Sequence, residues 1–274
     1  MIAARFGYTL VLQTLKSLMC SWSCSLRIPQ SVTGIVEAGH FDGKNVMVVS
    51  DKASDLLESV MHHILRSDVQ SLILVSPDVS AFLSRVRRHL FPDEDQVPAD
   101  CRLFFQPNDL RDKEKVDTFV DNLRQNSKLR LHHILLLTGN QEGEEGSSDF
   151  PVQHLMQRLQ QANLLLPQSK ILITSASVRR FFTMYWLRPD VRWEKDDMPP
   201  KYMYMLIGYT SRISINNIPR LVSCHRIFFF LQQWLSFLTQ ALFAMNPDYI
   251  SAIIITALGS QTSDSFFIYG KAVK

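Results

Sequence analysis

Short apolar, often β-branched runs alternate with helix-length amphipathic stretches along the middle of the chain. The longer stretches repeat apolar residues at helical spacing, as Leu56, Val60 and Ile64 do. The short runs have the length and composition of buried strands. The pattern predicts strands at residues 45–49, 71–75, 102–105, 133–138 and 170–174, and helices at residues 53–65, 79–90, 111–126 and 152–164.

Strands that alternate with helices in this way predict parallel pairing, because each helix carries the chain back along the sheet and covers one of its faces. Right-handed crossovers then produce an open, doubly wound sheet. The predicted fold class is therefore α/β, with a mostly parallel, Rossmann-like sheet in three α/β/α layers.

This rhythm is lost after Ser175. Residues 179–220 mix aromatic, charged and proline residues and predict an irregular insertion. Residues 227–245 carry no charge and predict a helix buried within the protein or at a homodimer interface, with membrane contact as the alternative. The β-branched run at residues 249–256 predicts a sixth strand.

The first 36 residues contain no acid, and their charged side chains are those of Arg5, Lys16 and Arg27. An acid-free basic leader is typical of a mitochondrial targeting segment, whereas a basic residue before an apolar run is typical of a membrane anchor. A third interpretation is an amphipathic helix packed on the domain. We expect residues 1–36 to form a targeting or anchoring segment or such a packed helix, and residues 37–274 to form the domain. The expected location is membrane-associated or mitochondrial, and otherwise cytoplasmic.

Composition narrows the function classes. The 274 residues are 46% hydrophobic and 20% charged, which excludes wholesale disorder. The 29 Lys and Arg residues nearly balance the 26 Asp and Glu residues, so the net charge of +3 predicts no nucleic-acid partner. The 4 cysteines lack the spacing of a disulfide framework or of a metal-ligand set, so we expect no metal.

Residues at the ends of the predicted strands match one family position by position. The matches are Asp109 and Leu110 after the third strand, Thr138, Gly139 and Asn140 at the end of the fourth, Ser175 at the end of the fifth, and Ile250–Gly259 as the sixth. With the order of elements, they make residues 44–260 similar to the short-chain dehydrogenase/reductase family, which mostly transfers hydride with NAD(H) or NADP(H). The resemblance implies a position near the adenine ring for Asp109 and a catalytic role for Ser175.

The first turn departs from the family's pattern. In the family, the three glycines of TGxxxGxG let the backbone approach the pyrophosphate at a helix N-terminus. The matching residues 50–57 contain no glycine, and Asp51 and Asp55 add negative charge there. Asp78 favours NAD over NADP if either cofactor binds. The short tail after Gly259 predicts a truncated or vestigial seventh strand. The candidate cofactor-binding residues are Ser50, Lys52, Ser76, Asp78, Asp109, Leu110 and Gly139.

The family's proton donor, a tyrosine followed four residues later by a lysine, is also missing. None of the 7 tyrosines has this partner. Counting back from the predicted sixth strand places the pair at Ile227 and Leu231, which cannot carry a proton. Tyr209 with Arg212 is the nearest substitute, and Tyr202 is the other candidate acid. The candidate catalytic residues are Ser175, Tyr209 and Arg212.

Three functions stay open. The two departures favour a non-catalytic descendant of the fold that acts as a binding or scaffolding module, with membrane contact through the N-terminal segment. Ser175 and Asp109 favour instead an atypical NAD(P)-dependent oxidoreductase that acts on a carbonyl or an alcohol. A flavodoxin-like regulatory domain shares the alternating pattern but does not predict the Ile-Leu-Ile-Thr-Ser strand.

Overall fold

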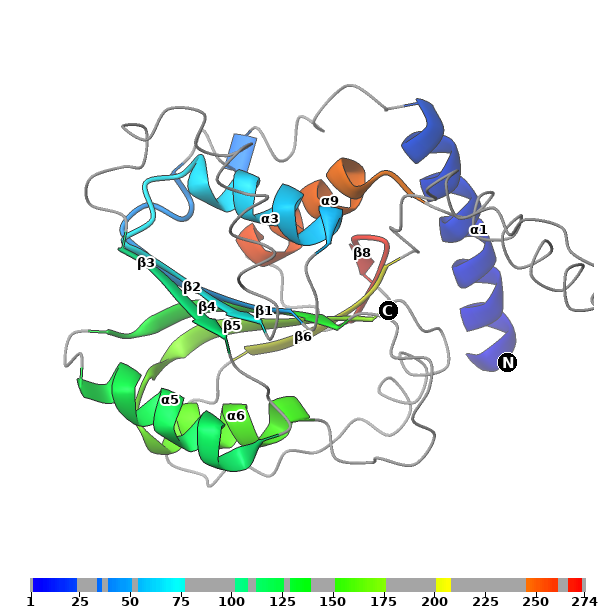
Figure 1. Ribbon diagram of the computed structural model, residues 1–274. Helices are drawn as coiled ribbons and strands as arrows, with labels where there is room; N and C mark the ends of the chain where they lie inside the picture. The colour runs from blue at the N-terminus through cyan, green and yellow to red at the C-terminus, as the bar shows by residue number, and fades with distance from the viewer. Residues whose placement is uncertain are drawn as a thin grey trace, which may run out of the picture.

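An 8-stranded sheet forms the centre of the computed structural model (Figure 1). Its strand order is β3-β2-β1-β4-β5-β6-β7-β8. The strands are β1 (Asn45–Ser50), β2 (Ser71–Ser76), β3 (Arg102–Pro107), β4 (Leu131–Thr138), β5 (Leu165–Ser175), β6 (Lys201–Leu206), β7 (Phe266–Ile268) and β8 (Lys271–Ala272). Every neighbouring pair from β3 to β7 is parallel, and β8 returns antiparallel to β7. The structure describes residues 2–23, 34–35, 39–50, 54–76, 102–107, 112–125, 129–138, 151–175, 201–207, 245–260 and 266–272.

The sheet is doubly wound, which confirms the predicted fold class. From β1 the chain builds outward through β2 to β3, and β4 then begins the other half on the opposite side of β1. The first five strands all occur where the sequence predicts them. In sheets of this kind, ligands bind at the carboxyl ends of the strands where the order reverses, which here is between β1 and β4.

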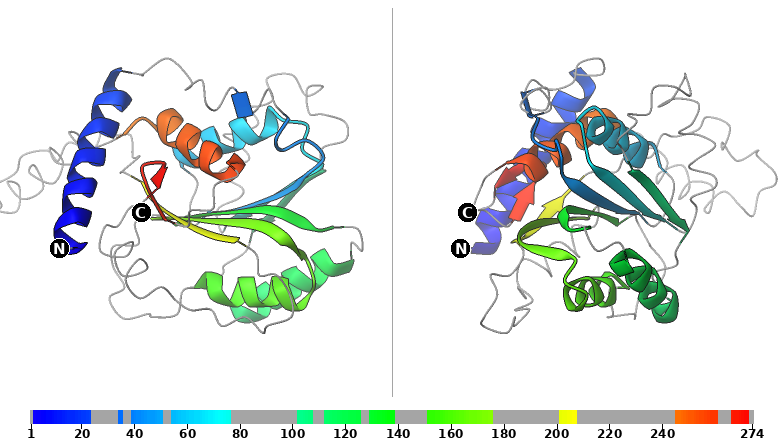
Figure 2. Two further views of the ribbon diagram at one scale, coloured as in Figure 1. Left: turned by 180° about the vertical axis from the view of Figure 1, so that it is seen from behind. Right: turned by 90° about the vertical axis from the view of Figure 1, so that its left-hand side faces the viewer.

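Helices cover both faces of the sheet and complete the three layers. Helices α3 (Asp55–Leu65) and α9 (Pro247–Gly259) lie on one face, and α5 (Lys113–Gln125) and α6 (Pro151–Gln161) lie on the other (Figures 1 and 2). Successive strand residues point to opposite faces, so the sheet contributes to two separate hydrophobic cores.

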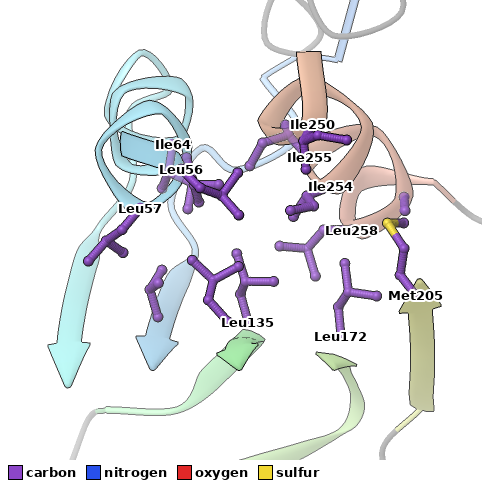
Figure 3. Close-up of a cluster of buried hydrophobic side chains, with 14 of the residues drawn as sticks. Leu56, Leu57, Ile64, Leu135, Leu172, Met205, Ile250, Ile254, Ile255 and Leu258 are labelled. Carbon is purple, nitrogen blue, oxygen red and sulfur yellow. The ribbon is translucent and has the colours of Figure 1, made fainter. Parts of the chain in front are cut away.

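The core beneath α3 and α9 is built from aliphatic side chains. In Figure 3 the side chains of the two helices lie over Leu135, Leu172 and Met205, which come from β4, β5 and β6. The labelled helical residues in that view are Leu56, Leu57, Ile64, Ile250, Ile254, Ile255 and Leu258. The inward face of α3 is therefore the one that its helical spacing predicts.

Residues 247–259 form helix α9, so the predicted sixth strand at residues 249–256 is wrong. The β-branched run favours a strand locally, but a helix start precedes it. The Asn246 side chain accepts a hydrogen bond from the Asp248 backbone N at 2.9 Å, and Pro247 occupies the first turn, where its missing N–H costs nothing. Burial against α3 and the sheet then outweighs the β-propensity.

The sixth strand is instead β6, which lies inside the predicted irregular insertion at residues 179–220. That prediction is wrong over β6, which pairs with β5 so that Leu206 lies opposite Ser175. The match of Ile250–Gly259 to the family's sixth strand is wrong for the same reason. The seventh strand is β7, which has 3 residues and pairs in parallel with β6, and its truncation relative to the family stays a prediction.

The N-terminal residues form helix α1 (Ile2–Ser23), which stands beside the β7 and β8 end of the sheet (Figures 1 and 2). Leu18 is buried in the core beneath α9, Leu10 packs against the other core, and Thr14 is hydrogen-bonded to the Tyr269 phenol. This is the packed arrangement among the three interpretations. In the part of the chain that the structure describes, no helix combines the length and apolarity needed to cross a membrane.

Two predicted helices and the domain boundary stay predictions. The helix at residues 79–90 and the boundary between residues 36 and 37 lie outside the described residues. So does the helix at residues 227–245 apart from Met245, and with it the homodimer interface.

Candidate functional site

Four neighbouring strands end in hydroxyl residues at the carboxyl edge of the sheet. In sheet order these are Ser76 of β2, Ser50 of β1, Thr138 of β4 and Ser175 of β5, which we call the hydroxyl row. Ser175 lies opposite Thr138, and Ser50 lies opposite Leu137. The hydroxyl row therefore crosses the point between β1 and β4 where the strand order reverses.

The serines of the hydroxyl row are buried beneath this edge. Ser76 is 0% exposed, and Ser50 and Ser175 are each 3% exposed. Each of them also interacts with other groups of the protein. A hydroxyl is neutral, so the row supplies no charge that could neutralise an anionic ligand.

The helix that follows β1 is closed at its N-terminus by its own side chains. α3 begins after Ser54, whose Oγ accepts a hydrogen bond from Leu57 N at 3.2 Å. Asp55 and Glu58 place two carboxylates in the first turn. A helix start attracts anions through free N–H groups and its partial positive charge. Here the Ser54 hydroxyl accepts from one of these N–H groups, that of Leu57, and the two carboxylates offset the partial positive charge.

Leu57, in the first turn of α3, fills the space between the helix and the sheet. It stands where the TGxxxGxG pattern has its last glycine, which lets helix and strand pack closely. The Leu57 side chain is 0% exposed and belongs to the core between α3 and the sheet (Figure 3). This helix start therefore serves packing.

A second polar cluster lies at the opposite, amino edge of the sheet. The ring centroids of His40 and His133 are 5.5 Å apart, and both rings contact Phe41. Burial, reinforced by the charge of Lys44, lowers the pKa of His40 to about 4 and that of His133 to about 2. Both imidazoles are therefore neutral near pH 7, and neither nitrogen of His133 has a hydrogen-bond partner in the described part of the chain.

Lys170 connects this cluster to the end of α9. Its Nζ donates hydrogen bonds to the carbonyl oxygens of Leu258 and Ser260. A cation at the C-terminus of a helix stabilises the helix by meeting its last carbonyl groups. Among the described residues, no group of three or more His, Cys, Asp or Glu side chains could hold a metal ion.

Several solved structures have the same architecture. A 2-keto-3-deoxy-D-gluconate dehydrogenase from Streptococcus agalactiae aligns with a TM-score of 0.53 at 11% identity, over 83% of this chain and 92% of that chain. RhlG from Pseudomonas aeruginosa, in a complex with NADP at its active site, aligns with a TM-score of 0.51 at 12% identity, over 84% and 96% of the two chains. A short chain dehydrogenase from Mycobacterium smegmatis aligns with a TM-score of 0.50 at 11% identity, over 86% and 95%. The chain has the short-chain dehydrogenase/reductase fold. No family model and no curated protein matches its sequence.

The short-chain dehydrogenase/reductase fold brings three of the predicted site residues to one edge. These are Ser50, Ser76 and Ser175, at the ends of β1, β2 and β5. The other predicted site residues lie outside the described residues, and their roles stay predictions. They are Lys52, Asp78, Asp109, Leu110, Gly139, Tyr209 and Arg212.

Tyr202 does not lie at the carboxyl edge, so its prediction as the proton donor is wrong. It pairs with Ile171, four residues before Ser175, which is about 13 Å along the strand. Burial, with a smaller contribution from Tyr204, raises the pKa of Tyr202. A proton donor that works near pH 7 needs the opposite shift.

The expected place of the Tyr-Lys pair also changes. The pair was expected at Ile227 and Leu231 because these residues lie at the family's distance before a sixth strand that begins at residue 249. Because β6 begins at Lys201, the same count ends near residue 179, outside the described residues. Ile227 and Leu231 are therefore not the residues at the proton-donor position of this fold.

Sequence reasoning missed the role of Ser54. The available signal was a serine directly before an acidic residue and an apolar run at helical spacing, which is typical of a capped helix start. With that signal, the loop after β1 ends at Ser54 and the first turn of α3 carries the acids.

Proposed function

We propose that this chain is a non-catalytic descendant of the short-chain dehydrogenase/reductase fold that acts as a binding or scaffolding module. The observation that carries the proposal is the closed N-terminus of α3. There Ser54 takes up a backbone N–H, and Asp55 and Glu58 supply negative charge.

The first turn of α3 does not fit a dinucleotide. The pyrophosphate of NAD or NADP carries two negative charges and needs free backbone N–H groups and close backbone approach. At about 5 Å and an effective dielectric constant of about 20, each repulsion between like unit charges costs about 3 kcal/mol. The carboxylates of Asp55 and Glu58 therefore oppose pyrophosphate binding at this position.

The central sheet and its carboxyl edge are compatible with a protein that binds a ligand without redox chemistry. The sheet is held between two cores, and its carboxyl edge carries the uncharged hydroxyl row of Ser76, Ser50, Thr138 and Ser175. The hydroxyl row brings no positive charge that would favour a phosphate group at this edge.

The alternative is an atypical NAD(P)-dependent oxidoreductase that acts on a carbonyl or an alcohol. Its support is Ser175, which ends β5 opposite Thr138 at the edge where ligands bind in this fold. A cofactor would then have to be held by backbone donors other than those of the first turn of α3.

Titration of the full-length protein with NADH and with NADPH, followed by nicotinamide fluorescence, tests the proposal. We expect no saturable signal at micromolar cofactor. Saturable micromolar binding of either dinucleotide would overturn it, and loss of an accompanying reductase activity in Ser175→Ala would establish the alternative.

A charge-neutral variant sharpens this test. Asp55→Asn combined with Glu58→Gln keeps the shape of the first turn and removes its two charges. If these charges are the obstacle, the variant binds the dinucleotide at least about tenfold more tightly than the wild type. Asp121→Asn removes one charge on the exposed side of α5 and should leave binding unchanged.

A further inference from the structure

Helix α1 presents an apolar stripe to solvent. Tyr8, Val11, Leu15 and Met19 are 70%, 59%, 53% and 70% exposed, and we call these four residues the α1 stripe. Their spacing of three, four and four residues places them on one side of the helix. Large exposed apolar groups that gather in one patch mark an interaction surface.

The opposite side of α1 already holds the helix on the protein. Leu18 is buried in one core, and Ser17 is 4% exposed. Thr14 is hydrogen-bonded to the Tyr269 phenol, and Leu10 packs against the second core. The attachment of α1 therefore depends on the side of the helix opposite the α1 stripe.

The charged residues of α1 indicate which kind of partner the α1 stripe binds. The helix carries Arg5 and Lys16 and no acid, and Lys16 is exposed immediately after Leu15. A second copy of the same helix would bring these like charges together without a compensating acid. An anionic lipid surface instead meets the basic residues with negative charge and the stripe with acyl chains.

The geometry of α1 suits a helix that lies on a bilayer. It has 22 residues and does not have the apolarity of a membrane span. A basic helix with an apolar side lies in the plane of the interface and inserts only that side. We propose that α1 binds the surface of an anionic bilayer through the α1 stripe, with the exposed Lys16 at the lipid headgroups.

This attachment would place the candidate ligand edge near the lipid. The backbone N of Tyr269, whose phenol contacts α1, donates to Leu206 O at 3.0 Å, and Leu206 lies opposite Ser175. The helix thus stands at the β6 and β7 end of the carboxyl edge. Membrane binding through α1 is independent of whether a dinucleotide binds at that edge.

Co-flotation of the full-length protein with vesicles tests the proposal. The vesicles are phosphatidylcholine alone or phosphatidylcholine with phosphatidylserine, at low and at high salt. We expect binding to the phosphatidylserine vesicles that weakens at high salt, because the lysine and arginine contribution is screened. No binding, or equal binding to both vesicles at both salt concentrations, would overturn the proposal.

Leu15→Glu places a charge in the middle of the α1 stripe and should lower vesicle partitioning by at least about tenfold. Gln13→Glu adds the same charge to the same helix away from the stripe and should keep more of the binding. Met19→Glu is the second stripe variant if Leu15→Glu folds poorly, as judged by urea denaturation. Equal loss in the stripe variants and in Gln13→Glu would overturn the role of the stripe. So would a wild-type dimer that Leu15→Glu dissociates and that does not bind vesicles.

Discussion

Helices α1 and α9 are both rich in apolar residues and carry few charges, yet the protein places them in opposite surroundings. α9 lies beside α3 on one face of the sheet (Figure 1), and Ile250, Ile254 and Leu258 are each 0% exposed. α1 lies at the rim, where Tyr8 and Met19 are each 70% exposed. Burial thus depends on how many elements surround a helix, and an apolar composition alone does not decide it.

The two helices should differ most in how much stability the protein loses when one of their apolar side chains is replaced by alanine. Ile254→Ala leaves a cavity between α9 and the sheet and should lower the free energy of unfolding by about 2–5 kcal/mol. Leu15→Ala removes a side chain that already faces solvent and should change it by less than about 0.5 kcal/mol. Urea denaturation of the two variants and the wild type measures both values. A loss above 1–2 kcal/mol in Leu15→Ala would mean that α1 is covered in solution.

Acid should destabilise the protein through the two buried histidines near the end of α9. His40 lies beside Gly259 at the end of α9 and packs against His133. Burial lowers the pKa of both rings, to about 4 and about 2, from the ordinary value of 6.5. The unfolded chain therefore binds more protons, so stability is complete above pH 6.5 and falls as the pH drops toward 4. For the buried His133 the loss at pH 4 is of the order of 3 kcal/mol.

Urea denaturation between pH 4 and pH 8 measures this dependence. His133→Phe keeps an aromatic ring beside Phe41 and removes the titrating group, so its stability should vary less with pH than that of the wild type. An equally steep decline in His133→Phe would assign the acid sensitivity to other groups.

The smallest effect concerns the start of α9. Asn246→Ala removes the side chain that accepts from Asp248 N and should cost about 1 kcal/mol of the free energy of unfolding. Asn246→Asp keeps an acceptor at the same place and should cost less. Thermal unfolding followed by circular dichroism compares the two variants, and equal losses would show that the side-chain cap does not stabilise the helix.

The first half of the fold follows from local pattern. Each of its predicted strands and the helices α3 and α5 appear close to their expected bounds, because an apolar run or an amphipathic period agrees there with the final environment. Ser50, Ser76 and Ser175 were each predicted as site residues, and they meet at one edge because parallel strands bring their carboxyl ends together.

The second half shows where local pattern is insufficient. The run of isoleucines in α9 is typical of a strand. Lys201–Leu206 does form a strand, but its alternating tyrosine and methionine residues are flanked by proline and charged residues, which predict an irregular segment. Only two residues, Asn246 and Pro247, indicate that the run of isoleucines is a helix, because they form a typical helix start. The pairing of β6 with β5 becomes apparent only when the sheet is assembled.

Residue type and spacing were enough to predict the order of the first five strands and of helices α3, α5 and α6. They also showed that no glycine lies between Ser50 and Leu57 and that no tyrosine is followed four residues later by lysine. These properties are local, since they depend on residue type and spacing. Only the tertiary structure decided that residues 247–259 are helical, that Tyr202 lies far from Ser175, and that the apolar side of α1 faces outward. Those outcomes depend on which segments meet in space, and burial against distant partners contributes more free energy than the propensity of a single residue.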